Sequence, residues 1–225
     1  MTQQRHTPDP LDLEDAMSSS EAFIIKYKNK FLGGVAAVVI VVAGIIGYQH
    51  FISGPNEIKA SESLFKGEQY FSTDNYDLAL KGDSIGYKGF LAIANEYSGT
   101  DAGKLANAYA GICYAQLGNY EQAIQYLDKF SADDELITPA LMATMGNCYA
   151  QLEQFDKAAA LLVKAADKAN SQALSPIYLV QAGQIYEKLG KNAEACNAYK
   201  TVKEKYARSF QALDIDKYIE RASTK

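Results

Sequence analysis

The stretch AGICYAQLGNYEQA, residues 110–123, decides the fold, because it recurs twice further along the chain. The second copy is MGNCYAQLEQFDKA at residues 145–158, and the third is AGQIYEKLGKNAEA at residues 182–195. A weaker copy precedes them, with Gly67, Tyr70 and Ala79 at matching places. Self-similarity at a spacing of 35 and 37 residues is typical of stacked helical repeats.

Each copy predicts two helices joined by a tight turn. The small residue near its start lets the first helix press against the second, and the tyrosine three residues later fills the wedge between them. The alanine that ends each copy marks the closest approach of the two helices, and a large apolar residue follows it. The expected turns are Gly118-Asn119, Glu153-Gln154 and Gly190-Lys191, the close alanines are Ala123, Ala158 and Ala195, and the large apolar residues are Leu127, Leu162 and Tyr199.

This pattern resembles the tetratricopeptide repeat, whose period is near 34 residues. The resemblance implies an all-α fold in which the repeats form an α-solenoid. The repeat domain is expected at residues 53–225, with units near residues 57–99, 102–132, 139–170 and 175–202 and a capping helix at 203–221.

The two ends of the array depart from the pattern. In the first unit Asp83 stands where a large apolar residue is expected, and the segment 82–99 reads as an added helix. The apolar face of that helix would carry Tyr87, Phe90, Ile93 and Tyr97. The capping helix is expected to turn Tyr206, Phe210, Leu213 and Tyr218 inward.

The run FLGGVAAVVIVVAGIIGY, Phe31–Tyr48, carries no charge and is apolar on every side. Its 18 residues suffice to cross a hydrocarbon core of about 30 Å as a helix. The sequence therefore predicts a juxtamembrane stub and an N-terminal transmembrane helix at residues 21–52, with membrane contact over residues 31–52. A cleaved signal peptide is disfavoured, because the run is too long and ends without a small-residue cleavage site. Residues 53–56 read as a break.

The flanks of this run differ. Residues 1–20 are rich in Pro, Asp, Ser and Gln and are expected to be disordered. Lys26, Lys28 and Lys30 precede the run, whereas Glu57 and Lys59 on the far side cancel. Because lysine excess marks the cytoplasmic side, we expect a cytoplasmic N-terminus and an exported repeat domain.

Composition excludes several functions. The net charge is −5, with only three arginines, so no basic stripe for nucleic acid is expected. The two histidines, His6 and His50, lie outside the repeats, so neither a metal cluster nor a nucleophile with a histidine base is expected there. The chain is therefore predicted to be no enzyme, with no cofactor, no metal and no small-molecule substrate.

Three cysteines, Cys113, Cys148 and Cys196, occupy apolar helical patterns and read as core residues. Cys113 and Cys148 hold equivalent places in neighbouring units, whose helices are displaced by about 8–10 Å. A disulfide needs Cα atoms within about 7 Å, so a native bridge is disfavoured. A redox role is the alternative.

Repeat arrays bind through their concave face, which the first helix of each unit lines. The predicted groove residues are apolar, small or amide-bearing, which suits an extended, partly apolar polypeptide or a partner helix. The alternative is that many of them only pack. A clamp for a C-terminal carboxylate is rejected, because only Asn147 resembles its basic and amide residues. The predicted set is Leu64, Glu68, Phe71, Ala108, Ile112, Ala115, Gln116, Ala143, Asn147, Ala150, Gln151, Val180, Gln184, Glu187 and Lys188.

The whole layout over residues 11–225 resembles the ancillary SecYEG translocon subunit family, most clearly in Glu21–Phe51 and in the helix with Ala60 and Leu64. This resemblance implies a single-pass protein of the bacterial inner membrane with periplasmic repeats. Its partners would be the SecYEG translocon, periplasmic chaperones or exported chains, and its role would be to assist translocation or hand-over to chaperones. The alternatives are a scaffold of another envelope complex, such as outer-membrane or cell-wall machinery, and a regulator that faces the cytoplasm.

Overall fold

A computed structural model describes residues 10–131 and 134–224; side chains are described from Tyr27 on, apart from those of Asn29, Phe31, Gln49 and Ile52. The chain divides into two compact units, Met1–Pro55 and Asn56–Lys225. The described residues form helices and no strand, so the all-α class is confirmed for this part of the chain.

The first unit holds one long helix, α1 (Pro10–Tyr48), followed by a π-helical turn, η1 (Gln49–Ser53). The disorder predicted for residues 1–20 is wrong for residues 10–20, because α1 already begins at Pro10. Proline suits the first position of a helix, since its φ is helical and its missing N–H is not needed there. Residues 1–9 lie outside the described residues.

The predicted membrane span falls within α1. Across the described residues, no helix has both the length and the apolar character that a membrane crossing requires. The side chain of Phe31, with which the predicted span begins, lies outside the described residues. The transmembrane helix therefore stays a prediction.

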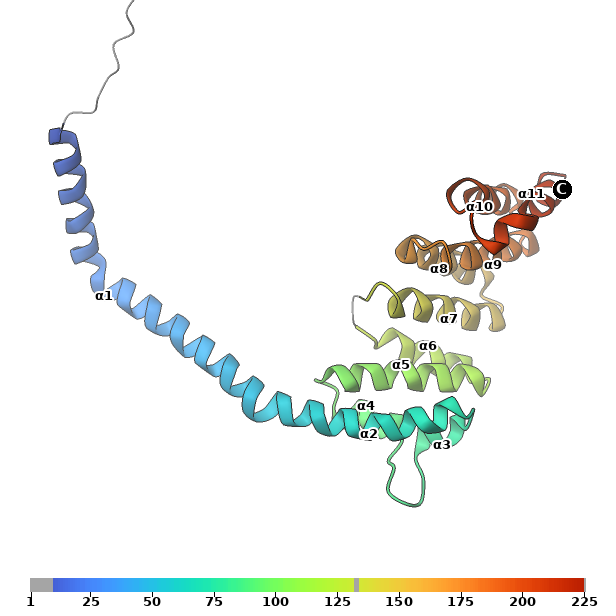
Figure 1. Ribbon diagram of the computed structural model, residues 1–225, viewed down its shortest axis with the longest axis horizontal. Helices are drawn as coiled ribbons and strands as arrows, with labels where there is room; N and C mark the ends of the chain where they lie inside the picture. Colours follow the sequence, from blue (N-terminus) through green and yellow to red (C-terminus); the bar gives the residue numbers. More distant parts are fainter. Residues whose placement is uncertain (1–9, 132–133, 225) are drawn as a thin grey trace, which may run out of the picture. The chain divides into compact units, whose positions relative to one another are not determined.

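The second unit is a stack of paired helices that follow one another in chain order (Figure 1). Its first helix continues directly from η1, so the break predicted at residues 53–56 is wrong: Pro55 sits in the first helical turn, where it costs no hydrogen bond. The helices are α2 (Gly54–Ser72), α3 (Tyr76–Lys81), α4 (Phe90–Glu96), α5 (Asp101–Gln116), α6 (Tyr120–Asp128), α7 (Ile137–Gln151), α8 (Phe155–Ala169), α9 (Ser175–Lys188), α10 (Asn192–Lys205), the 3₁₀ turn η2 (Phe210–Asp214) and α11 (Ile215–Ser223).

One contact within each helix pair explains why a glycine and a large apolar residue recur at the same spacing in the three copies. A Cβ on Gly111 would lie 2.6 Å from Cγ of Leu127, and one on Gly146 would lie 3.0 Å from Cγ of Leu162. In the third pair a Cβ on Gly183 would collide with the ring of Tyr199. Glycine in the first helix therefore makes room for the large side chain of the second, as the sequence predicts.

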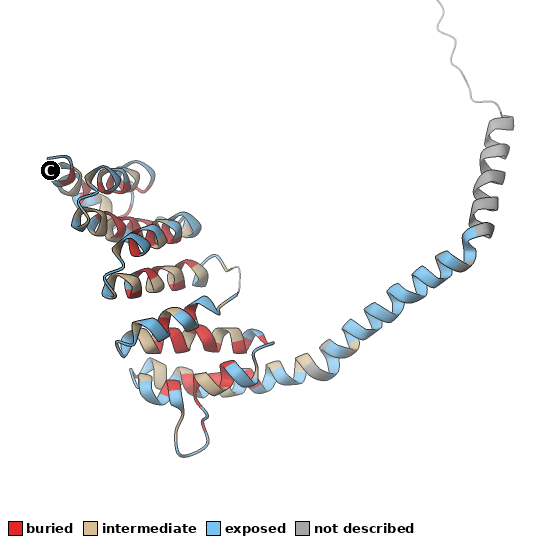
Figure 2. Cartoon of the chain, turned by 180° about the vertical axis from the view of Figure 1, so that it is seen from behind, coloured by how far each residue is buried: buried red, intermediate tan, exposed pale blue. Residues whose placement is uncertain are grey.

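Buried residues occur throughout the helices of the second unit (Figure 2). They form two large clusters and a small one. One large cluster joins α2 to α5, and the other joins α7 to α11. The small cluster contains Ala108, Leu127 and Leu141, and links α5 and α6 to α7. The array is therefore continuous, but its core is thinnest between α6 and α7.

The segment 82–99 is only partly helical. Its helix, α4, begins at Phe90 rather than near residue 82, and Tyr87 lies in the preceding loop, where it is buried. Asp83 explains this loop: its Oδ1 accepts the backbone N–H of Ile85 at 2.9 Å and that of Tyr87 at 2.8 Å, and its Oδ2 accepts the hydroxyl of Tyr70 at 2.7 Å. These bonds stabilise a turn where the pattern predicted a helix.

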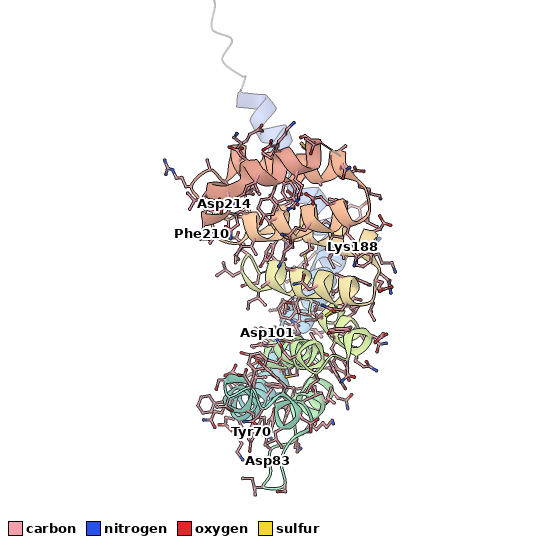
Figure 3. All side chains as sticks on the ribbon, turned by 90° about the vertical axis from the view of Figure 1, so that its right-hand side faces the viewer. Tyr70, Asp83, Asp101, Lys188, Phe210 and Asp214 are labelled. Carbon is pink, nitrogen blue, oxygen red and sulfur yellow. The ribbon has the colours of Figure 1, made fainter. Side chains whose placement is uncertain are left out.

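The predicted inward capping helix at 203–221 is wrong in two places. Helix α10 ends at Lys205, and the chain turns before η2. The Ser209 hydroxyl accepts the N–H of Ala212 and starts η2 in a new register. As a result the side chains of Phe210 and Leu213 are 82% and 77% exposed. Phe210 is labelled in Figure 3. Ile215 and Ala222 of α11 are buried in their place, while Tyr206 and Tyr218 do pack inward.

Candidate protein-binding groove

The predicted groove lies on the first helices of the pairs, α5, α7 and α9, with α2 at its N-terminal end. We refer to the surface formed by α5, α7 and α9 as the first-helix face. Some predicted residues belong to the core instead of this surface: Leu64 and Ala143 are buried, and Phe71 packs edge-on against Tyr109 at 5.1 Å. That the remaining residues bind a partner stays a prediction.

The charged residues of the predicted set already have partners within the chain. The Glu187 carboxylate accepts N–H bonds from Arg221 of α11 at 2.9 and 3.1 Å. The ammonium of Lys188 lies 3.9 Å from the ring centroid of Phe155. These side chains therefore tie α9 to α11 and α8, which reduces their availability for a partner.

The remaining positions are mostly polar amides and small residues. The side chains of Gln116, Asn147, Gln151 and Gln184 are exposed, near the ends of the first helices. Each amide can both donate and accept a hydrogen bond, which matches the backbone of an extended polypeptide. Ala115, Ala150, Val180 and Ile112 are half-buried between them.

An apolar depression of about 310 Å³ lies on the first-helix face between α5 and the beginning of α7. We call it the α5–α7 hollow. Two of the residues that line it, Leu136 and Ile137, are 70% and 39% exposed although both are large and aliphatic. The full lining is Leu105, Ala108, Tyr109, Ile112, Leu136, Ile137, Ala140 and Leu141.

Sequence reasoning found only Ala108 and Ile112 of this lining. It missed Leu105, Tyr109 and Ala140, which lie one turn before predicted groove positions on the same helices. A further signal was the apolar pair Leu136-Ile137 directly after an acidic run and directly before a helix. Adjacent large apolar residues in a polar connection indicate a contact surface when they are exposed.

Two carboxylates accept hydrogen bonds from residues that line the α5–α7 hollow. Oδ1 of Asp134 accepts the N–H of Leu136 at 2.8 Å and that of Ile137 at 2.6 Å, and these bonds hold the pKa of Asp134 below its usual range. The next residue, Glu135, is exposed and lines a separate depression with Lys168, Ala169 and Asn170. On the α5 side, the Tyr109 hydroxyl donates to Oε1 of Glu68 at 3.0 Å. Burial and this bond raise the pKa of Tyr109 to about 12, so the phenol stays neutral beside the hollow.

The titratable side chains of the described residues can be compared with the needs of a metal site. No group of three or more His, Cys, Asp and Glu side chains there could hold a metal ion. The cysteines are free thiols, and burial raises the pKa of Cys113 to about 12 and that of Cys148 to about 11. The arrangement offers a surface for contact.

Comparison with known proteins agrees with this geometry. The family model for the tetratricopeptide repeat matches residues 109–133 and 178–219, which cover α6 and α10 and parts of their partner helices. The chain contains tetratricopeptide repeats. Between the two matched stretches, α7 and α8 repeat the glycine-to-leucine contact of their neighbours, as Gly146 and Leu162 show.

Solved structures with a similar fold include those of MamA. A crystal structure of the MamA protein has 15% sequence identity and a TM-score of 0.50, and the match covers 73% of this chain and 90% of that chain. A structure of MamA AMB-1 has 17% identity and a TM-score of 0.46, over 75% of this chain and 99% of that chain. The likeness to the first structure is one of fold. No curated protein matches the chain.

Tetratricopeptide repeats bind proteins, so the second unit is a protein-interaction module, built on a fold that is typically a non-catalytic scaffold. The resemblance to the ancillary SecYEG translocon subunit family is not confirmed by these comparisons.

Proposed function

We propose that this protein is a membrane-tethered interaction module of the cell envelope, which binds polypeptide segments through its first-helix face. The observation that carries the proposal is the α5–α7 hollow, because Leu136 and Ile137 expose large aliphatic side chains beside it. Contiguous exposed apolar surface on a protein is often a contact site.

The tether is proposed from α1. The side chains of Leu32, Val38, Ile40 and Ile46 are all exposed, and they point in different directions around the helix. A helix that is apolar all round needs apolar surroundings, which a bilayer would supply. The uncharged run Phe31–Tyr48 has the length that such a crossing needs.

The orientation is proposed from charge. Lys26, Lys28 and Lys30 precede the apolar run, and the positive-inside rule then keeps the N-terminus in the cytoplasm. The repeats would lie in the periplasm of a bacterium, next to chains that leave the inner membrane. This location and the resemblance to ancillary SecYEG translocon subunits support a role in translocation or in transfer of exported chains to periplasmic chaperones.

Cross-linking of native membranes followed by mass spectrometry tests this function. The expected partners are translocon subunits, exported chains or periplasmic chaperones, with cross-links that map to α5 and α7. In the same membranes, protease added outside spheroplasts should digest the repeats. Repeats that resist protease until the cells are lysed would instead support a regulator facing the cytoplasm.

A second candidate is a scaffold of another envelope complex. Phe210 and Leu213 of η2 favour it, since both are exposed apolar side chains at the C-terminal end of the array and neither lines the hollow. A scaffold holds two partners at once. Co-purification in mild detergent of outer-membrane or cell-wall machinery, with no translocon component, would favour this candidate over the first.

A further inference from the structure

We propose that the joint between α6 and α7 is a hinge, and that bending at this joint opens and closes the α5–α7 hollow. The hinge goes beyond the proposed function, because it belongs to the fold and operates whether or not a polypeptide is bound. It divides the second unit into an N-terminal block, α2–α6, and a C-terminal block, α7–α11.

Each block has a core of its own. In the N-terminal block, α2 to α5 share one large cluster of buried residues, and α6 is held to α5 by the contact between Gly111 and Leu127. In the C-terminal block, α7 to α11 share the other large cluster, which includes Ala143 of α7 and Leu162 of α8. The two clusters consist of different residues. Because stacked repeats contact only their neighbours, each block can keep its shape while the joint bends.

The joint is weak because α6 is short. Helix α6 has 9 residues, whereas α8 and α10, the second helices of the next two pairs, have 15 and 14. Helix α7 lies between the α5–α6 pair and α8 (Figure 1), so it loses packing partners where α6 ends early. The small cluster that joins the blocks consists of Ala108, Leu127 and Leu141. By contrast, a buried hydrogen bond of 2.7 Å from the Ser175 hydroxyl to the Ala166 carbonyl ties α9 to α8. Bending is therefore easiest between α6 and α7.

An open space lies on each side of Leu141. The hollow of about 310 Å³ is on the α5 side of α7, where Ile137 and Ala140 line it. A smaller cavity of about 130 Å³ is on the α6 side, where Met142 and Met145 line it together with residues from the end of α6. Leu141 lines both spaces. When α7 rocks about Leu141 toward α5, the hollow closes and the cavity widens, and the opposite movement opens the hollow.

The two arrangements differ little in free energy. Atoms that line an empty space lack contacts on one side and lose the dispersion attraction of those contacts. Closing one space restores contacts there and removes contacts at the other, so the two changes offset each other. Met142 and Met145 ease the exchange, because unbranched side chains adapt to cavities of different shape. A side chain that fills the hollow would hold it open and shift the population toward that arrangement.

Distances between spin labels test the hinge on the full chain in detergent micelles. Labels at Glu62 and Lys164 span the joint, whereas the pairs Glu62–Gln122 and Lys164–Glu220 each lie within one block; all four positions are exposed. The labels are attached to introduced cysteines in a Cys196→Ser chain, whose two remaining native thiols are buried. Electron–electron double resonance on frozen samples should give a distribution at least about twice as wide across the joint as within either block.

Substitutions that fill the two spaces give a sharper test. Ala140→Phe places a large side chain in the hollow and should open it, whereas Met145→Trp fills the smaller cavity and should open that side instead. The mean distance between the labels that span the joint should therefore shift in opposite directions in the two variants. Asn147→Phe is the matched control, because this exposed position of α7 lines neither space and should leave the mean distance unchanged. Ala140→Leu and Met145→Phe replace the larger substitutions if circular dichroism shows that those do not fold.

Two results would overturn the hinge. The first is a distribution across the joint that is no wider than those within the blocks, with a mean distance that neither filling substitution changes. The second is a shift of the same sign in both filling variants, which would show general overpacking rather than rocking about Leu141. Neither result bears on the proposed function, which the cross-links to α5 and α7 test separately.

Discussion

Gly111 of α5 lies against Leu127 of α6 so closely that a Cβ on the glycine would stand 2.6 Å from Cγ and 2.9 Å from the backbone nitrogen of the leucine. The helices of this pair can meet at that distance only because the first one has no side chain there. The same relationship recurs in the next two pairs, with Gly146 and Leu162 and with Gly183 and Tyr199. It explains why a glycine and a large apolar residue recur sixteen residues apart in each copy of the repeat.

Gly111→Ala should therefore destabilise the array by about 1–3 kcal/mol through overpacking, because the backbone of Leu127 cannot move aside like a flexible side chain. Gly146→Ala should cost less, since its nearest neighbour would be 3.0 Å away. Gly99→Ala is the control, because a Cβ there would meet nothing within 4 Å. Thermal unfolding of the full chain in micelles, monitored by circular dichroism, gives the melting temperature of each variant, which should be lowest for Gly111→Ala and highest for Gly99→Ala. Equal melting temperatures for all three would contradict this explanation.

The turns between paired helices predict a stabilising change. Gly118 and Gly190 adopt positive φ values of 79° and 71°, and the equivalent residue of the middle pair, Glu153, is forced to a φ of 57°. A residue with a Cβ is strained there by roughly 1–2 kcal/mol, which the larger unfolded-state entropy of glycine offsets in part. Glu153→Gly should thus stabilise the chain by about 0.5–1 kcal/mol, and Gly118→Ala should destabilise it. A lower melting temperature for Glu153→Gly would show that the strain is absent.

Asp83 should make the array sensitive to acid. The Tyr70 hydroxyl and the N–H groups of Tyr87 and Ile85 stabilise its ionised form and hold the pKa of Asp83 below its usual range. A group with a lowered folded-state pKa contributes stability above its unfolded pKa of about 3.9, and this contribution is lost as the pH falls through the folded value. Asp83→Asn should therefore lower the melting temperature at pH 7 and matter progressively less below about pH 4. An exposed change on α8, Asp167→Asn, should show no such dependence.

The cysteines should differ in reactivity. Burial raises the pKa of Cys113 to about 12 and that of Cys148 to about 11, so neither supplies thiolate near neutral pH. Cys196 is half-buried, with its Sγ 3.5 Å from the Ser223 hydroxyl. A disulfide reagent at pH 8 should modify about one thiol rapidly in the native chain and three in denaturant, and Cys196→Ser should abolish the rapid reaction. Rapid modification of two or three native thiols would contradict this assignment.

The repeats could be predicted from sequence because a local rule, glycine against a large apolar residue, fixes each helix pair. The ends of the array could not. A helical pattern places Phe210 and Leu213 inward, but the Ser209 cap starts η2 in another register and leaves both exposed. At the other end, the segment around Tyr87 has helical spacing, yet hydrogen bonds to Asp83 form a turn. In both cases a short polar side chain determines the local backbone through its hydrogen bonds. The spacing of apolar residues carries no information about such bonds.

The binding surface was only half predictable for a different reason. Repeat geometry identifies which face of α5, α7 and α9 is available to a partner. Whether a side chain on that face is exposed depends on the distance between neighbouring helix pairs. Ala143 is buried because the pairs of α7 and α9 share one core, whereas the thin core between α6 and α7 leaves Leu136 and Ile137 exposed. Helix spacing of this kind comes from tertiary packing, so it cannot be read from a single repeat.

The most direct test of the central claim, that polypeptide binds on the first-helix face, is photo-cross-linking in native membranes. A benzophenone side chain at position 137 lies beside the α5–α7 hollow, and one at position 160 lies on the exposed side of α8. The account predicts that position 137 captures polypeptides upon illumination and that Ile112→Glu reduces the capture, whereas position 160 captures little. Equal capture at both positions, unaffected by Ile112→Glu, would contradict it.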